Sequence, residues 1–80
     1  MHLSIYSIEK TIFDGEVASV TLPTPLGEMT VLEHHIPLVS TISAGEIRYV
    51  LTGNTVETVA FRGGILEVQP ESRVVVLANV

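Results

Sequence analysis

Two adjacent histidines, His34 and His35, are the residues of this chain that most readily suggest chemistry, because imidazole is a common ligand for metal ions. On an extended segment successive side chains point to opposite faces, so one ion could not easily bind both. The only other histidine is His2, and the chain has no cysteine. We therefore favour a solvated or partner-facing loop here, with a metal site as the alternative.

Acid–base or nucleophilic catalysis would need a pair of carboxylates or an activated hydroxyl. Glu28 and Glu33 are five residues apart, and this odd spacing places them on opposite sides of a regular strand. No serine lies in a Gly-x-Ser-x-Gly context, and the glycines form neither Gly-x-Gly-x-x-Gly nor a P-loop. The sequence predicts a non-enzymatic protein without metal or other cofactor.

The overall charge narrows the classes of partner. The chain has 80 residues and a net charge of −5, with four fixed cations, which are too few to neutralise a phosphate backbone. Nucleic acid is therefore a poor candidate partner, and a basic protein surface is a better one. No apolar stretch approaches the roughly 18 to 20 residues that cross a bilayer, so we expect any membrane association to come through a partner.

The apolar residues alternate with a period of two, as in strands. Ala18, Val20 and Leu22 would share one face of a strand, and Ile47, Tyr49 and Leu51 would share one face of another. Residues 56–61 and 73–79 are rich in β-branched side chains. No segment repeats apolar residues at helical spacing over two turns, so we expect no substantial helix.

Turn signals recur between these runs. Gly53-Asn54 has the residue types of a two-residue hairpin turn. Further signals lie at Asp14-Gly15, Pro23 to Gly27, Gly63-Gly64 and Pro70 to Ser72. This spacing is typical of short antiparallel strands, and it predicts one all-β domain over residues 1–80, a sandwich of two antiparallel sheets with about eight or nine strands.

Read in order, these segments resemble the epsilon subunit of F-type ATP synthases, called delta in mitochondria. The matching segments are Leu3-Ser4-Ile5, Glu9 to Val17, Val20 to Pro23, Gly27-Glu28, Val31-Leu32, His35 to Val39, Gly45 to Arg48, Gly63 to Val68 and Val74 to Ala78. Their order and spacing agree across nearly the whole chain. The resemblance covers the N-terminal β-sandwich domain of that family.

The resemblance implies a sandwich of about ten strands at the foot of the central stalk, or rotor. In that family the domain packs against the gamma subunit and rests on the ring of c subunits, where it couples rotation to ATP synthesis without catalysing a reaction. It would then be a peripheral component at the cytoplasmic face of a bacterial membrane, in a complex that translocates protons or sodium ions.

The same resemblance implies site residues. Glu28 and His35 match the family carboxylate and histidine at the end of the sandwich that faces the c-ring, and Ser7 and Ser40 match positions that face gamma. His34 departs from the family, which often has Gly, Asn or Pro there, and this change would alter the loop.

The family usually continues into two C-terminal helices that bind ATP or inhibit hydrolysis in several bacteria. This chain stops at Ala78-Asn79-Val80, where those helices would begin, so neither property is transferred to it. Because Met1 resembles a natural start, we expect a natural short form.

Two other readings stay open. A free-standing sandwich could bind a protein or a small molecule such as a sugar. A sugar site would need an exposed aromatic platform, but the sequence has no Trp and only four aromatic residues, Tyr6, Phe13, Tyr49 and Phe61. Three of these four lie in strand runs and are better placed in the core. A small metal-dependent β-barrel enzyme is the third reading, and the His34-His35 geometry argues against it.

Overall fold

The computed structural model describes all of residues 1–80 as eight strands without a helix. No segment therefore forms a helix that is long and apolar enough to cross a membrane. The strands are β1 (His2–Tyr6), β2 (Thr11–Thr24), β3 (Gly27–Leu32), β4 (Leu38–Ile42), β5 (Gly45–Leu51), β6 (Val56–Phe61), β7 (Gly64–Gln69) and β8 (Arg73–Ala78).

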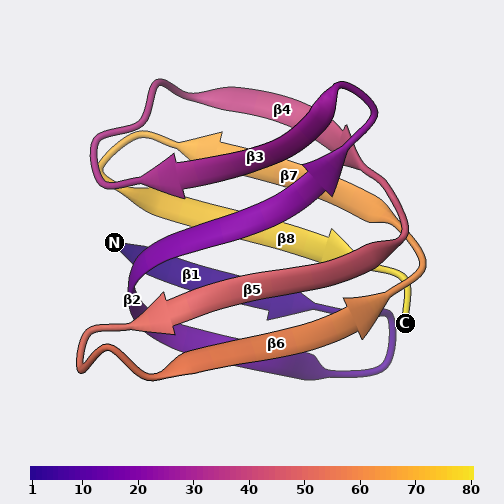
Figure 1. Ribbon diagram of the computed structural model, residues 1–80, viewed down its shortest axis with the longest axis horizontal. Helices are drawn as coiled ribbons and strands as arrows, with labels where there is room; N and C mark the ends of the chain where they lie inside the picture. The colour runs from indigo at the N-terminus through magenta and orange to yellow at the C-terminus, as the bar shows by residue number, and fades with distance from the viewer.

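The strands form two packed layers (Figure 1). Sheet A has the order β4-β7-β8-β1-β2, and sheet B has the order β3-β2-β5-β6. The long strand β2 belongs to both, because its first half pairs with β1 and its second half pairs with β3 and β5. The predicted two-sheet sandwich is confirmed, and its eight strands are close to the predicted number.

One pair of neighbours departs from the antiparallel pattern. Strands β1 and β8 run parallel, with His2 beside Arg73 and Tyr6 beside Leu77, whereas every other pair is antiparallel. These are the first and last strands of the chain, so no short turn connects them and their relative direction is free of the hairpin constraint. The sheet signal in the sequence, which comes from local turns, did not reveal this pair.

Two expectations for β2 are wrong. Asp14-Gly15 is not a turn but lies inside the strand, where a Cβ on Gly15 would be 3.2 Å from Cζ of Phe13, so the glycine makes room for a ring. Ala18 does not share the buried face with Val20, because the register with β5 shifts between Val17 and Ser19. This bulge leaves Ala18 exposed and buries Val17 instead.

The other turn signals lie at strand ends or between strands. Pro25 and Leu26 connect β2 to β3, and residues 70–72 connect β7 to β8. Gly53-Asn54 lies in the β5–β6 hairpin, although the loop runs over residues 52–55, with Asn54 in the left-handed conformation at φ 69°. Gly63-Gly64 does not close a hairpin, because it carries the chain from sheet B to sheet A.

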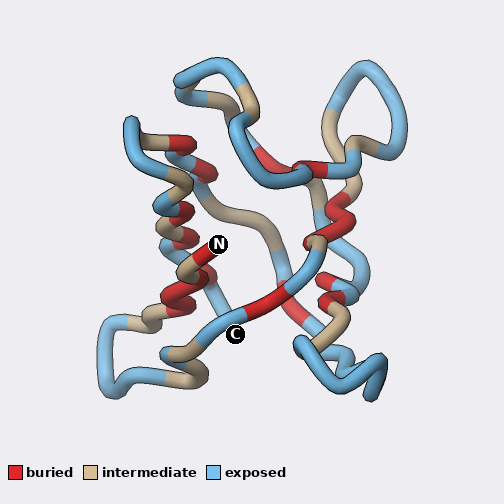
Figure 2. Tube along the Cα trace, turned by 90° about the vertical axis from the view of Figure 1, so that its left-hand side faces the viewer, coloured by how far each residue is buried: buried red, intermediate tan, exposed pale blue.

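The core fills the space between the layers. Figure 2 shows buried positions along both layers and exposed loops above and below them. Tyr49 and Phe61 are buried, and the ring of Tyr49 packs on the half-buried Phe13 at a centroid distance of 4.5 Å. The fully buried side chains come from both sheets: Leu3, Ile5, Val17, Val20, Leu22, Val31, Ile47, Leu66, Val74 and Val76.

Candidate functional site

The histidines and carboxylates that suggested chemistry do not converge on one point. His34 lies in a turn after β3 at φ 65°, and its backbone N–H donates to Oγ of Ser72 at 3.2 Å. Glu28 lies near Arg48, whereas Glu33 lies 3.9 Å from the N-terminal ammonium. No three His, Asp or Glu side chains gather in a metal-binding arrangement. The candidate functional sites described below are therefore exposed surfaces of the domain.

Glu28 is held at the start of β3 by the turn that precedes it. The hydroxyl of Thr24 donates to the Gly27 carbonyl at 2.6 Å and accepts the N–H of Leu26 at 3.2 Å, which fixes the turn. The Glu28 carboxylate is exposed on the outer face of sheet B, with Oε1 3.8 Å from Nη2 of Arg48. At an exposed site such a pair contributes little to stability, so the carboxylate is free to meet a partner.

His35 is fixed more firmly. Its backbone N–H donates to the Leu32 carbonyl at 3.2 Å, which closes the turn after β3. Its Nδ1 lies 2.8 Å from the carbonyl oxygen of Ile36, and because a carbonyl only accepts, Nδ1 carries the proton and Nε2 remains available. The ring is half-buried, and the neighbouring Ile36 is 78% exposed.

Glu28 and His35 thus lie on one rim of the sandwich but at opposite ends of β3. Strand β3 is the outermost strand of sheet B, β4 is the outermost strand of sheet A, and both follow the upper edge in Figure 1. The strand from Glu28 to Leu32 alone spans about 13 Å. The structure therefore does not bring the two side chains together, and a partner that touched both would have to extend along the rim.

Apolar side chains are also exposed along this rim. Leu26 in the β2–β3 turn is fully exposed, and Val39 on β4 is 71% exposed. Together with Glu28, His35 and Ile36 they form what we call the β3–β4 rim.

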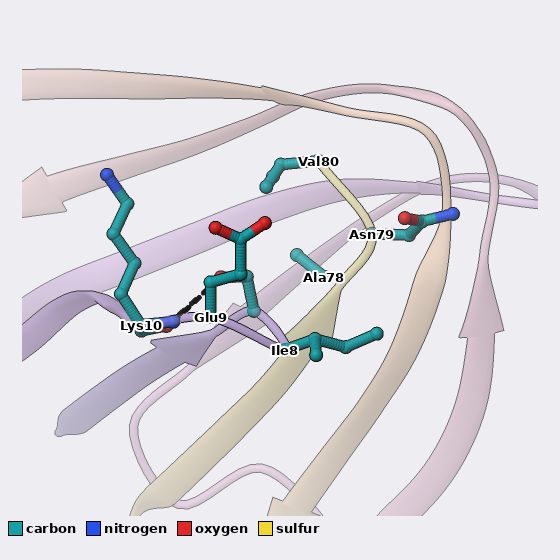
Figure 3. A pocket seen from close by; sticks show the side chains of 7 residues that line it. Ile8, Glu9, Lys10, Ala78, Asn79 and Val80 are labelled. Atoms are coloured by element: carbon teal, nitrogen blue, oxygen red, sulfur yellow. Dashed lines mark hydrogen bonds between the residues drawn. The ribbon is translucent and has the colours of Figure 1, made fainter.

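Ser7 directly follows β1 of sheet A, in the loop between β1 and β2, and it is not part of the β3–β4 rim. Its N–H donates to the Lys10 carbonyl at 2.8 Å, and its hydroxyl accepts the Lys10 N–H at 3.2 Å, so the serine closes the loop. A small hollow of about 180 Å³ opens beside it, with Ile8, Glu9 and Lys10 on the loop side and Ala78, Asn79 and Val80 from the end of β8 (Figure 3).

A larger apolar groove of about 320 Å³ adjoins this hollow. Its floor is the outer face of sheet A, where the register aligns Tyr6, Leu77 and Ile65 side by side on three neighbouring strands. Leu77 is 52% exposed and Ile65 is 45% exposed. We call these three residues, with Ile8 at the end of the row, the apolar row.

Ser40 lies on β4, at the edge of sheet A. By register it stands beside Leu66 and so faces the interior, where it is half-buried, and its hydroxyl donates to the Thr41 carbonyl at 2.9 Å. The neighbouring Val39 and Thr41 face outward. Because Val39 belongs to the β3–β4 rim, a second partner at this part of β4 would contact Thr41 instead of Ser40.

The apolar row was not singled out from the sequence, although a signal for it exists. The run Val74-Val75-Val76-Leu77-Ala78 has no polar alternation, and such runs indicate strands covered on both faces. The structure covers only the inner face of β8. The outer face of this strand therefore lacks the cover that its sequence indicates.

Comparison with known proteins identifies close relatives. Residues 1–80 match the family described as "ATP synthase, Delta/Epsilon chain, beta-sandwich domain". The chain is 43% identical over 79 residues to a protein named ATP synthase epsilon chain from Bordetella parapertussis, covering 99% of this chain and 56% of that protein. The protein of the same name from Neisseria meningitidis is 40% identical over 81 residues, covering 100% of this chain and 57% of its own length. The chain thus spans little more than half the length of these curated relatives.

Solved structures with the same fold come from rotary complexes. A chain of the Euglena gracilis mitochondrial ATP synthase OSCP/F1/c-ring structure superposes with a TM-score of 0.89 at 26% identity, covering 95% of this chain and 48% of that chain. A chain of the Tetrahymena thermophila mitochondrial ATP synthase central stalk/c-ring structure gives a TM-score of 0.85 at 15% identity. The superposition covers 63% of the Tetrahymena chain. At 15% identity the likeness concerns the fold alone.

Proposed function

This chain belongs to the family of ATP synthase delta/epsilon β-sandwich domains, and from that premise we propose that it is a non-catalytic component of the central stalk of a rotary ATP synthase. It docks to the gamma subunit and to the c-ring, and it transmits rotation between them without making or breaking a bond. The complex translocates protons or sodium ions, and the domain is held peripherally at the cytoplasmic face of the membrane through its partners.

The observation that carries this proposal is the uncovered apolar row on sheet A. Tyr6, Ile65 and Leu77 form the floor of an apolar groove, and exposed apolar patches of this kind mark interaction sites. The row ends at Ile8, next to Ser7 in the β1–β2 loop. Ser40 belongs to β4, the outermost strand of the same sheet, although its side chain faces the interior. We assign this face to the gamma subunit because it offers apolar area for a stable contact.

The β3–β4 rim has a different character and suits the c-ring. It presents the carboxylate of Glu28, the imidazole of His35 and the exposed side chains of Ile36 and Val39. Polar groups at the edge of an interface mainly set register and encounter rate. An acidic domain with net charge −5 would meet basic or polar loops favourably through this rim.

A charge placed on the apolar row tests the gamma contact. We expect Leu77→Asp to weaken binding to purified gamma subunit at least tenfold, because it would bury an unpaired carboxylate in the interface. The matched control is Val56→Asp, which places the same charge on β6, where Val56 is 53% exposed against 52% for Leu77. Equal binding of both variants and the unchanged protein in calorimetry would contradict the assignment.

The rim is tested separately by Glu28→Ala combined with His35→Ala. We expect this variant to fold and to bind gamma, but to lower ATP-driven ion pumping in reconstituted membranes or to loosen attachment to the c-ring. If the complex with this variant assembled and pumped ions normally, the β3–β4 rim would not be the contact with the c-ring. Recovery of the protein alone from native membranes under gentle conditions would favour a free-standing binding module.

A further inference from the structure

His2 occupies an unusual position between two carboxylates. It lies on the outer face of β1, directly opposite Glu16 on β2 and diagonal to Asp14 on the same strand. Its Nδ1 is 3.0 Å from Oε2 of Glu16, and its Nε2 makes a short contact with Oδ1 of Asp14. The proposed docking function makes no use of this cluster, which lies at the end of β1 opposite to Ser7.

The chemistry of imidazole decides which protonation state fits this position. Ionised carboxylates only accept hydrogen bonds, whereas neutral imidazole has one N–H donor and one bare nitrogen. Both nitrogens of His2 face a carboxylate oxygen, so only the doubly protonated ring satisfies both contacts. When the ring loses a proton, one of the two carboxylates faces a lone pair.

The remaining charged groups near His2 are few. On the other flank, Arg73 of β8 stands beside His2 in the parallel register, and a cation there opposes protonation. The N-terminal ammonium lies 3.9 Å from Oε1 of Glu16 and 3.9 Å from Oε1 of Glu33. The two direct contacts to carboxylates outweigh this opposition, and the pKa of His2 is raised from 6.5 by hydrogen bonds to Glu16 first and to Asp14 second.

We propose that the Asp14–His2–Glu16 bridge is a pH-operated clasp that fastens β1 to β2 while His2 is protonated and loosens this end of sheet A when His2 becomes neutral. The clasp lies next to the backbone hydrogen bonds that join the start of β1 to β2. The N–H of Val17 donates to the Met1 carbonyl at 2.9 Å, and the terminal amino group donates to the Val17 carbonyl at 3.1 Å.

The direction of the pH effect follows from linkage. A histidine whose folded-state pKa is raised contributes stability that is fully present below its unfolded value near 6.5. That contribution disappears as the pH rises through the higher folded-state pKa. The clasp is therefore closed in mildly acidic solution and opens toward alkaline pH.

An NMR titration of the histidine ring resonances between pH 5.5 and 9 tests the first half of the proposal. We expect His2 to titrate above 6.5 in the unchanged protein and lower in Glu16→Gln and in Asp14→Asn, with the larger change in Glu16→Gln. The control is Glu46→Gln on β5, which alters the net charge equally without facing His2. A His2 midpoint at or below 6.5, or one that neither substitution lowers, would overturn the proposal.

Amide exchange tests the second half. After correction for base-catalysed intrinsic exchange, the protection of the Val17 amide should fall as the pH rises through the His2 midpoint. In the variant that combines Glu16→Gln with Asp14→Asn, this protection should no longer depend on that transition. If the protection of Val17 in the unchanged protein is the same on both sides of the midpoint, the bridge exists but does not act as a clasp.

Discussion

Gly64 is the residue at which a single methyl group should disturb the fold most. It begins β7 and pairs with Ala78 at the end of the β7–β8 ladder. A Cβ built on Gly64 would lie 2.0 Å from the backbone oxygen of Leu77 and 3.1 Å from its carbonyl carbon. Because both atoms belong to the backbone, no side-chain rotation can relieve the contact.

The size of the effect follows from the displacement required. An ordinary contact between a carbon and a carbonyl oxygen is about 3.3 Å long, so in Gly64→Ala the two strands must separate locally by about 1.3 Å. Two backbone bonds at this end, Arg62 N–H to Asn79 O at 2.6 Å and Asn79 N–H to Gly63 O at 2.8 Å, would then be broken or badly strained. At about 1 kcal/mol for each bond and 1–3 kcal/mol for overpacking, we expect a loss of about 3–5 kcal/mol.

That loss is a large part of the stability available to 80 residues, which is of the order of 4–12 kcal/mol. Urea denaturation followed by circular dichroism should show a reduced midpoint, and the thermal midpoint should fall by at least about 12 °C. The control is Gly53→Ala, because a Cβ there has no atom within 4 Å. A Gly64→Ala variant within about 0.5 kcal/mol of the unchanged protein would refute this reasoning.

Two further predictions concern the core. Leu66→Ala removes a fully buried side chain and should cost about 2–5 kcal/mol, whereas Leu77→Ala, on the half-exposed outer face of the same sheet, should cost less than about 1 kcal/mol in the same urea experiment. Burial raises the pKa of the Tyr49 phenol above 10, so the stability tied to its neutral form is complete below pH 10 and is lost as the pH rises through the higher folded-state value. Tyr49→Phe should therefore reduce the fall in denaturation midpoint between pH 9 and pH 11, and an unchanged fall would contradict this cause.

The strands that the sequence predicted well are those whose pattern is purely local. Ile47 and Tyr49 are buried while Arg48 between them is exposed, as the alternation on β5 requires. Alternation in β2 fails at Ala18, because a bulge inserts one residue and reverses the faces before it. A bulge of this kind depends on the partner strand, so a single strand's pattern does not reveal it.

Glycine was the least reliable signal. Gly15 and Gly64 both resemble turn residues in the sequence, yet each lies in a strand and leaves room for a neighbour: the ring of Phe13 in one case and the backbone of β8 in the other. Reading Asp14-Gly15 as a turn followed its residue types, but the room for a ring inside β2 depends on tertiary packing.

The site residues stay predictions. The roles of Glu28, His35, Ser7 and Ser40 came from the family resemblance, and they remain proposals. Their arrangement could not be read from the sequence, because the separation of Glu28 from His35 depends on the full length of β3. The apolar row needed the parallel pairing of β1 with β8, which places Tyr6 beside Leu77.

The same pairing has a consequence for the order in which the chain folds. Sheet B is assembled from residues 17–61, and much of it can form from neighbouring hairpins as soon as they leave the ribosome. Sheet A cannot, because β8 is inserted between β7 and β1 and is the last of the eight strands to be synthesised. Contacts that are so distant in sequence form slowly. Until β8 arrives, the edges of β1 and β7 stay open, and in this interval a nascent chain is most exposed to mispairing with another copy.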